Sequence, residues 1–277
     1  MDRQDVKPVQ IIRGNALSLP LADDSVDLVV TSPPYFGLRS YQDGGTHYSG
    51  QIGDEPTPAE FVDALIAATA EMVRVVKPSG SIWVNLGDKY AGGGGFAPDA
   101  PSNQPGGSGV AATRPRSRST ESRAAGGKAW GHRPKTLIGI PWRYAIRCID
   151  DLGLILRAEV IWSKPNGLPE SVADRVRRSH EQWFHFTKEP RYFSAVDEIR
   201  EAHLAPNRSG TNPKHESAPF AAGIPAHTSL STTQPNPLGK LPGSVWTIPT
   251  EPLHVPESLG IDHFAAFPTE WPRRIIQ

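Results

Sequence analysis

Four consecutive residues, Ser32-Pro33-Pro34-Tyr35, combine groups that a reaction at the exocyclic amine of a nucleobase would need. The lone pair of this amine is delocalised into the ring, so the nitrogen is a poor nucleophile unless acceptors hold its N–H groups out of the ring plane. The Ser32 hydroxyl and the Pro33 carbonyl could be those acceptors, since two prolines fix the carbonyl direction and add no competing N–H. The Tyr35 ring could stack on an extruded base. The alternative is a proline-stiffened loop with a buried tyrosine.

The tetrapeptide directly follows a predicted strand. Residues 26–31 have the apolar, β-branched character of an interior strand, and prolines must leave a sheet at its edge. A second predicted strand, residues 81–88, ends at Gly87-Asp88. Because ligands bind at the carboxyl ends of strands in α/β sheets, we expect the Ser32 turn and Gly87-Asp88 to meet at one edge.

The remaining pattern predicts an α/β sheet with a mostly parallel centre. A helix over 58–76 is marked by Thr57 as N-cap, Pro58 in the first helical position and Glu60 in a capping box. A second helix, from 141 to 152, has an apolar side formed by Trp142, Ala145, Ile146 and Ile149. Further strands are predicted at residues 9–12, 154–162 and 181–188.

Composition excludes several classes of protein. The 29 basic and 29 acidic side chains balance, so no overall charge draws the chain to nucleic acid or membrane. The single cysteine rules out an internal disulfide, no apolar run approaches the ~18 residues of a membrane span, and the charged N-terminus does not resemble a signal peptide. We therefore expect a cytoplasmic protein. The histidines lack HxxxH spacing and cysteine pairing, which predicts no metal site.

Residues 91–133 differ in composition from the rest of the chain. They hold ten glycines, six basic residues and two acids without hydrophobic periodicity. This composition is typical of a flexible surface insertion, and it is compatible with a mobile basic loop that orders on a polyanion.

Several stretches occur in the order of a known family. SVDLVVTSPPYFGL (25–38) resembles the catalytic motif of amino-group DNA methyltransferases, and RVVKPSGSIWVNLGD and the region from IPWRYAIRC to EQWFHFTK follow in family order. Near the end, SVWTIPTEP and HFAAFPTEWPRRII are similar to the segment before the cofactor loop in the permuted class that begins with the catalytic half. The resemblance implies a Rossmann-like sheet, S-adenosylmethionine as cofactor and double-stranded DNA as substrate.

The resemblance also implies roles for individual residues. The implied catalytic residues are Ser32, Pro33, Pro34 and Tyr35. The implied cofactor contacts are Asn15, Ala16 and Phe264. The expected DNA contacts are Lys164, Asn166, Arg175 and Arg178. The implied regions are the catalytic half at 1–199, a target-recognition region at 200–245, and a segment at 246–277 that leads to the cofactor loop.

The family pattern continues with a strand and a glycine-rich loop of the type DPFxGxG that binds S-adenosylmethionine, and no segment of this chain matches it. In the family sheet order 3-2-1-4-5-7-6, strands 1 and 2 would be absent, and the strand at 26–31 would expose an apolar edge. We expect an incomplete catalytic domain, from a truncated or split gene, that needs a second polypeptide for its cofactor half.

Three functions remain open at this stage. Ser32 in the first motif position is similar to cytosine-N4 enzymes, which we favour over adenine-N6 enzymes, where Asp is more frequent. A DNA-binding remnant without catalysis would also fit the unmatched cofactor loop. An unrelated α/β protein with an ordinary double-proline turn is the third alternative.

Overall fold

The computed structural model describes residues 9–38, 42–43, 46–47, 50–92, 130–167, 169–170, 172–203, 236–252 and 266–277. Most of the predicted basic insertion (91–133) and of the predicted target-recognition region (200–245) lies outside these ranges, as does Phe264.

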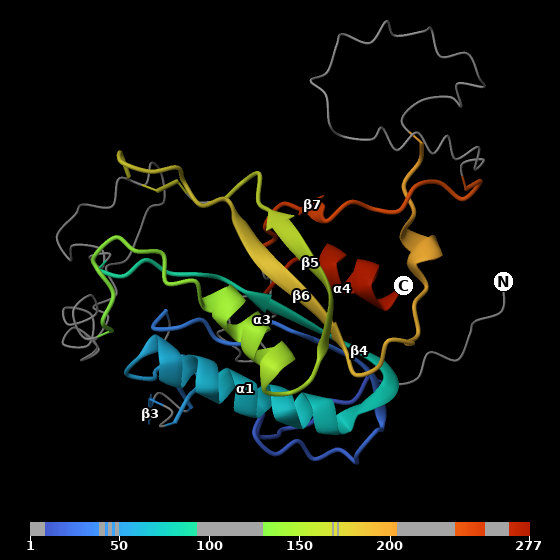
Figure 1. Cartoon of the computed structure of the whole chain (residues 1–277), viewed down its shortest axis with the longest axis horizontal. Coiled ribbons are helices and arrows are strands. Elements are labelled where there is room, and N and C mark those ends of the chain that lie inside the picture. Colours follow the sequence, from blue (N-terminus) through green and yellow to red (C-terminus); the bar gives the residue numbers. More distant parts are fainter. Residues whose placement is uncertain are drawn as a thin grey trace, which may run out of the picture.

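A five-stranded sheet forms the centre of the described structure (Figure 1). Its order is β1 (Val26–Thr31), β4 (Val76–Leu86), β6 (His180–Thr187), β5 (Ile155–Ser163) and β7 (Val245–Thr247). The first four positions agree with the order 4-5-7-6 implied by the family resemblance. A separate antiparallel pair joins β2 (Gln42–Asp43) and β3 (Thr46–His47).

The sheet is mixed, so the prediction of a mostly parallel centre is wrong. β1 is parallel to β4 and β5 is parallel to β7, but β6 is antiparallel to both β4 and β5. The connection between β5 and β6 contains no helix, and strands joined without a crossover pair in opposite directions. The carboxyl ends of β1, β4 and β5 therefore share an edge with the start of β6.

Helix α1 (Pro58–Val75) begins as the sequence predicts. The Thr57 hydroxyl accepts the N–H of Glu60 at 3.2 Å and contacts the Glu60 carboxylate at 2.8 Å. The helix ends earlier than predicted, because Val76 already pairs with Val26 as the first residue of β4. The register with β1 then shifts through a bulge that contains Pro78 and Gly80, and regular pairing resumes where Ser81 faces Leu28.

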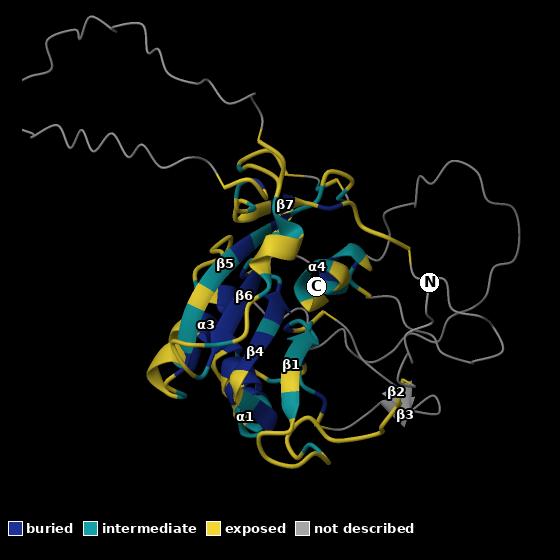
Figure 2. Cartoon of the chain, turned by 90° about the vertical axis from the view of Figure 1, so that its right-hand side faces the viewer, coloured by how far each residue is buried: buried dark blue, intermediate teal, exposed yellow. Residues whose placement is uncertain are grey.

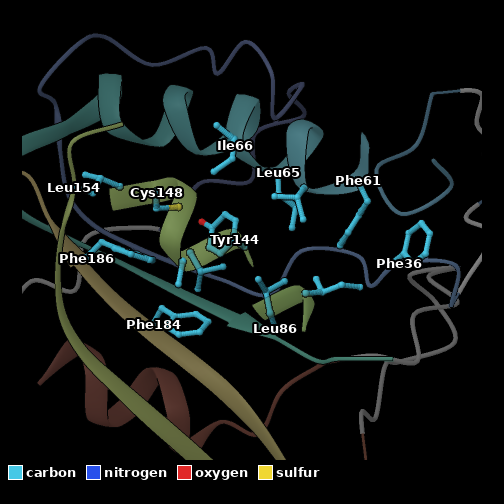
Figure 3. Close-up of a cluster of buried hydrophobic side chains, with 14 of the residues drawn as sticks. Phe36, Phe61, Leu65, Ile66, Leu86, Tyr144, Cys148, Leu154, Phe184 and Phe186 are labelled. Atoms are coloured by element: carbon cyan, nitrogen blue, oxygen red, sulfur yellow. The ribbon is translucent and has the colours of Figure 1, made fainter. Parts of the chain in front are cut away.

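Helix α3 (Ile140–Asp150) packs on the same face of the sheet as α1 (Figure 3). The prediction of its apolar, buried side is largely wrong. Ala145 is buried, but Trp142, Ile146 and Ile149 are exposed. The helix instead buries Tyr144 and Cys148. Tyr144 determines this orientation, since its hydroxyl bonds the Thr69 hydroxyl of α1 at 2.8 Å and its ring packs edge-on against Phe186.

The opposite face of the sheet is covered by α4 (Glu270–Ile276), as Figure 2 shows. Trp271 of this helix is fully buried and stacks on Trp183 and Trp246, with ring centroids 4.7 and 4.9 Å apart. A short 3-10 helix, η1 (Val196–Ile199), packs at the margin of this cluster. None of the described helices is long and apolar enough to cross a membrane.

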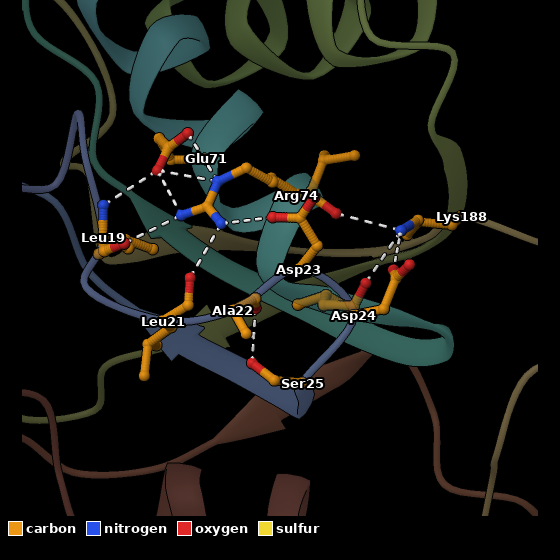
Figure 4. A network of polar contacts seen from close by, with 11 residues as sticks. Leu19, Leu21, Ala22, Asp23, Asp24, Ser25, Glu71, Arg74 and Lys188 are labelled. Atoms are coloured by element: carbon orange, nitrogen blue, oxygen red, sulfur yellow. Dashed lines mark hydrogen bonds and ion pairs between the residues drawn. The ribbon is translucent and has the colours of Figure 1, made fainter.

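The predicted strand at 9–12 is wrong, because these residues form no strand and Ile11 is 97% exposed. Within the described residues, β1 pairs only with β4. The chain between residues 19 and 25 is instead attached to α1 by Arg74 (Figure 4), which donates to the carbonyls of Leu19 and Leu21 and to Asp23 and Glu71. The expectation that an incomplete domain leaves this edge of β1 exposed stays a prediction.

Candidate active site

The Ser32 turn lies at the carboxyl edge of the sheet, where β1 and β4 end side by side. Asn85, one residue before the end of β4, is 1% exposed and faces this turn. Its Oδ1 accepts from the Tyr35 hydroxyl at 2.8 Å and from the Ser32 hydroxyl at 3.3 Å, while its Nδ2 donates to the carbonyl of Gln182 at 3.1 Å. Asn85 thus connects the turn to β6 and orients both hydroxyls without a titratable group.

Tyr35 is also held by a charged residue of β6. Its hydroxyl lies 2.7 Å from Oε2 of Glu181, whose other oxygen forms an ion pair with Lys164. Burial raises the pKa of Tyr35 well above its ordinary value, the Glu181 charge raises it further, and the positive charge of Arg178 opposes these effects. The phenol therefore stays protonated and acts as a hydrogen-bond donor to Asn85 or Glu181.

Two glycines make room for the turn. An added Cβ at Gly87 would lie 2.6 Å from Cε2 of Tyr35, so the absence of a side chain allows the ring to pack against the end of β4. Gly53 has a φ of +104°, and a Cβ added there would lie 3.1 Å from the Tyr35 carbonyl oxygen and 3.3 Å from Cβ of Pro34. The Gly53 carbonyl accepts the N–H of Gly37 at 2.7 Å and closes the far side of the turn.

Asp88, which the sequence places at the same edge, has a structural partner instead. Its carboxylate accepts the N–H groups of Gly139 and Ile140 at 3.0 Å and so caps the start of α3. The Pro33 carbonyl, by contrast, accepts no hydrogen bond from any residue that the structure describes. The acceptors left open toward a ligand are therefore the Pro33 carbonyl and the lone pairs of the Ser32 hydroxyl.

The predicted cofactor contacts are not brought together. Asn15 and Ala16 are exposed, and the Asn15 side chain accepts the N–H of Leu17 at 3.0 Å within its own turn. A cavity of about 800 Å³ lies between α4 and the sheet, and its lining runs along the face of the sheet from Asp27 and Ser81 to Val160 and Trp246. Neither Ser32 nor Tyr35 lines it.

Three of the four predicted DNA contacts have partners within the protein. Lys164 pairs with Glu181, and its backbone N–H donates to the carbonyl of Ser179 at 2.8 Å. Asn166 forms paired hydrogen bonds with the backbone of Thr250, at 2.8 and 3.1 Å. Arg175 binds Glu170 and lies over the ring of Tyr90. Only Arg178 keeps a buried, unpartnered guanidinium nitrogen among these described residues.

Sequence reasoning missed Asn85 and did not assign Glu181 to the site. The available signal was their position, because Asn85 is next to the last residue of β4 and Glu181 is the second residue of β6, where both strands reach the Ser32 edge. No group of three or more His, Cys, Asp or Glu side chains in the described ranges is arranged to hold a metal ion.

The family model described as DNA methylase, of the N6 and N4 type, matches residues 26–277. The type II methyltransferase M.XycI of Xanthomonas campestris pv. cyanopsidis is 41% identical over 195 residues, which cover 69% of this chain and 58% of that protein. M.Cfr9I of Citrobacter freundii is 39% identical over a match of the same extent. The chain thus spans less than two thirds of the length of these two relatives.

Two further comparisons cover nearly the whole chain. The type II methyltransferase M.SmaI of Serratia marcescens is 33% identical over 274 residues, or 98% of this chain and 75% of that protein. The solved structure of the PvuII cytosine-N4-specific DNA methyltransferase covers 95% of this chain with a TM-score of 0.55 and 18% identity, so it shows a shared Rossmann-like α/β fold. The match of the family model over residues 26–277 shows that the chain belongs to the N6/N4 DNA methylase family.

Proposed function

We propose that this chain is the catalytic half of an S-adenosylmethionine-dependent DNA methyltransferase that modifies the N4 amine of cytosine in double-stranded DNA. One observation carries the proposal. The Ser32 hydroxyl donates its proton to Asn85, which leaves the lone pairs of Oγ free, and the neighbouring Pro33 carbonyl has no donor among the described residues. Two open acceptors therefore lie side by side at the end of β1.

These acceptors suit an exocyclic amine. Each can take one N–H of the amine, which localises the nitrogen lone pair and disperses the positive charge that develops on it. The Tyr35 ring, fixed through its hydroxyl by Asn85 and Glu181, offers a preorganised face for the extruded base. Neither function requires a covalent intermediate or a strong base.

The described residues alone do not fit the cofactor, because Asn15 and Ala16 are exposed and the lining of the 800 Å³ cavity includes neither Ser32 nor Tyr35. Family membership supports S-adenosylmethionine as the methyl donor. We infer that residues other than those described here provide most of its binding site, either in the same polypeptide or in a second one, next to the open edge of β1. A donor held there would face the Ser32 turn.

The test is methyl transfer from labelled S-adenosylmethionine to mixed-sequence duplex DNA, followed by nucleoside analysis. This chain would be compared with a form extended through the downstream reading frame, each with Ser32→Ala as control. N4-methylcytosine from the extended form, lost in Ser32→Ala, supports the proposal. N6-methyladenine would instead support the adenine alternative, and DNA binding without methyl transfer by either form would support a DNA-binding remnant.

A further inference from the structure

One guanidinium nitrogen of the half-buried Arg178, Nη1, is itself buried and has no hydrogen-bond partner in the described structure. Four side-chain nitrogen or oxygen atoms in the described residues are buried and unpaired, and the Arg178 Nη1 is the only one that belongs to a charged group. The other three are Gln182 Oε1, Trp183 Nε1 and Trp271 Nε1. Because a buried N–H donor without an acceptor is costly, this atom indicates a place where a ligand supplies the acceptor.

Arg178 lies at the same edge as the Ser32 turn. It immediately precedes Ser179, whose carbonyl accepts the N–H of Lys164 at 2.8 Å where β5 and β6 meet. Arg178 also lies three residues before Glu181, whose carboxylate is 2.7 Å from the Tyr35 hydroxyl, and its positive charge acts to lower the pKa of both Tyr35 and His180. The two carboxylate oxygens of Glu181 bind Tyr35 and Lys164, and neither accepts a hydrogen bond from Arg178 Nη1.

Neighbouring arginines in the same loop behave differently. Arg175 pairs with Glu170, and Arg177 donates to the carbonyl of Gly167 at 3.0 Å. Both therefore shape the loop, whereas Nη1 of Arg178 is left without a hydrogen-bond partner among the described residues. Guanidinium is a planar donor that matches two adjacent acceptors, which distinguishes it from a lysine at the same position.

We propose that Arg178 donates its free N–H groups to the ring nitrogen N3 and the 2-carbonyl of the target cytosine and thereby selects cytosine over adenine. This inference rests on the proposed function and names a residue that would select its target base. Next to its amine, cytosine presents two acceptors in a row, N3 and O2, whereas adenine presents only N1 followed by a C–H group. A guanidinium fork finds both partners on cytosine and one on adenine, and it leaves an N–H unpaired in the second case.

The experiment measures base binding and requires neither cofactor nor methyl transfer. The 277-residue protein, labelled with ¹⁵N, is titrated with deoxycytidine, with deoxyadenosine, with inorganic phosphate, and with an aminopyridine nucleoside that keeps the amine and ring nitrogen of cytosine but lacks the 2-carbonyl. The readout is the Nε–H signal of Arg178, assigned by its loss in Arg178→Lys. Arg177→Lys, in the same loop, is the matched control.

We expect deoxycytidine to shift the Arg178 signal, with binding about tenfold or more tighter than that of the aminopyridine nucleoside or deoxyadenosine. In Arg178→Lys, monitored through the tryptophan indole signals, the difference between deoxycytidine and the aminopyridine nucleoside should disappear, while Arg177→Lys retains it. Equal binding of the two nucleosides by the unaltered protein would overturn the inference. A phosphate shift as large as that of deoxycytidine, or no shift up to the solubility limit of deoxycytidine, would overturn it as well.

The outcome is separate from that of the methyl-transfer test. Loss of all methyl transfer with preserved cytosine selectivity at Arg178 would remove the proposed activity and leave base recognition intact. Production of N4-methylcytosine by an extended enzyme whose base preference is unchanged in Arg178→Lys would remove this inference alone.

Discussion

The hydroxyl of Tyr35 lies 2.7 Å from the carboxylate of Glu181, a residue 146 positions later in the chain. Glu181 in turn pairs with Lys164, and the exposed fractions of these two side chains are only 16% and 18%. The aromatic ring of the Ser32 turn is therefore fixed by a shielded ion pair that joins the end of β5 to the start of β6.

This arrangement predicts that Glu181→Gln is destabilising although it preserves shape. The substitution leaves Lys164 as a shielded cation without a counter-ion, so we expect a loss of roughly 2 kcal/mol in the free energy of unfolding. Denaturant titration would measure it, with the exposed Glu189→Gln as control. The double variant Glu181→Gln with Lys164→Met should recover most of the loss, and a simple sum of the two single effects would contradict the coupling.

The close packing of Gly87 against Tyr35 predicts that a single added methyl group, in Gly87→Ala, lowers the stability of the protein. In Gly87→Ala the new Cβ would lie 2.6 Å from Cε2 of the ring, so either the ring or the end of β4 must move. We expect a stability loss of about 1–3 kcal/mol and weaker base binding at the turn. Gly243→Ala, where no atom lies within 4 Å of the added Cβ, is the matched control.

A variant of Tyr35 tests whether the cost of Gly87→Ala comes from a collision with the ring. When the ring is removed by Tyr35→Ala, the further change Gly87→Ala should cost little, because its collision partner is gone. An equal cost with and without the ring would show that Gly87 is needed for backbone conformation and not for this contact.

Much of the fold could be predicted because local signals and tertiary packing agree. Thr57 and Glu60 predict the start of α1, and the apolar run before Ser32 predicts β1, since capping and strand patterns act within a few residues. The side of α3 that is buried was not predictable from periodicity. Tyr144, a residue of intermediate polarity, turns inward because Thr69 of α1 provides a partner for its hydroxyl.

The sequence was enough to predict the catalytic motif of the site, but not the residues that hold this motif in place. Ser32 and Tyr35 belong to a contiguous tetrapeptide, whereas Asn85 and Glu181 reach the turn only through sheet pairing across β4 and β6. Arg178 could be predicted as a basic residue near the site. Its difference from Arg175 arises from the positions of Glu170 and Tyr90, which only the folded loop defines.

The reactivity of the Cys148 thiol can serve as a simple reporter of folding. Cys148 is completely buried, and burial raises the pKa of its thiol to about 12. Because the thiolate is the reactive form, we expect almost no reaction with a disulfide reagent at pH 8 in the folded protein and full reaction in concentrated urea. Cys148→Ser, which removes the only cysteine, should abolish the signal in both conditions. Rapid labelling of the folded chain would contradict the burial of α3 against α1.

His185 predicts how stability depends on pH. Burial, assisted by the charge of Arg157, lowers the pKa of His185 to about 4 from the ordinary 6.5, while its ring stacks on Trp83 and bonds the Ser81 hydroxyl. As the pH falls, His185 is therefore protonated near pH 6.5 in the unfolded chain but only near pH 4 in the folded chain. Stability is fully present above the unfolded pKa and is lost as the pH falls through this window.

The loss from His185 should approach roughly 3 kcal/mol between pH 7 and pH 4, since one pKa unit corresponds to about 1.4 kcal/mol. Denaturant titrations of the protein and of His185→Gln over this range would measure it. The variant is expected to be less stable at pH 7 but to show a flatter dependence on pH, because no group at that position takes up a proton on unfolding. The exposed His203→Gln should follow the unaltered protein. Parallel pH profiles for the protein and His185→Gln would assign the acid sensitivity to other groups.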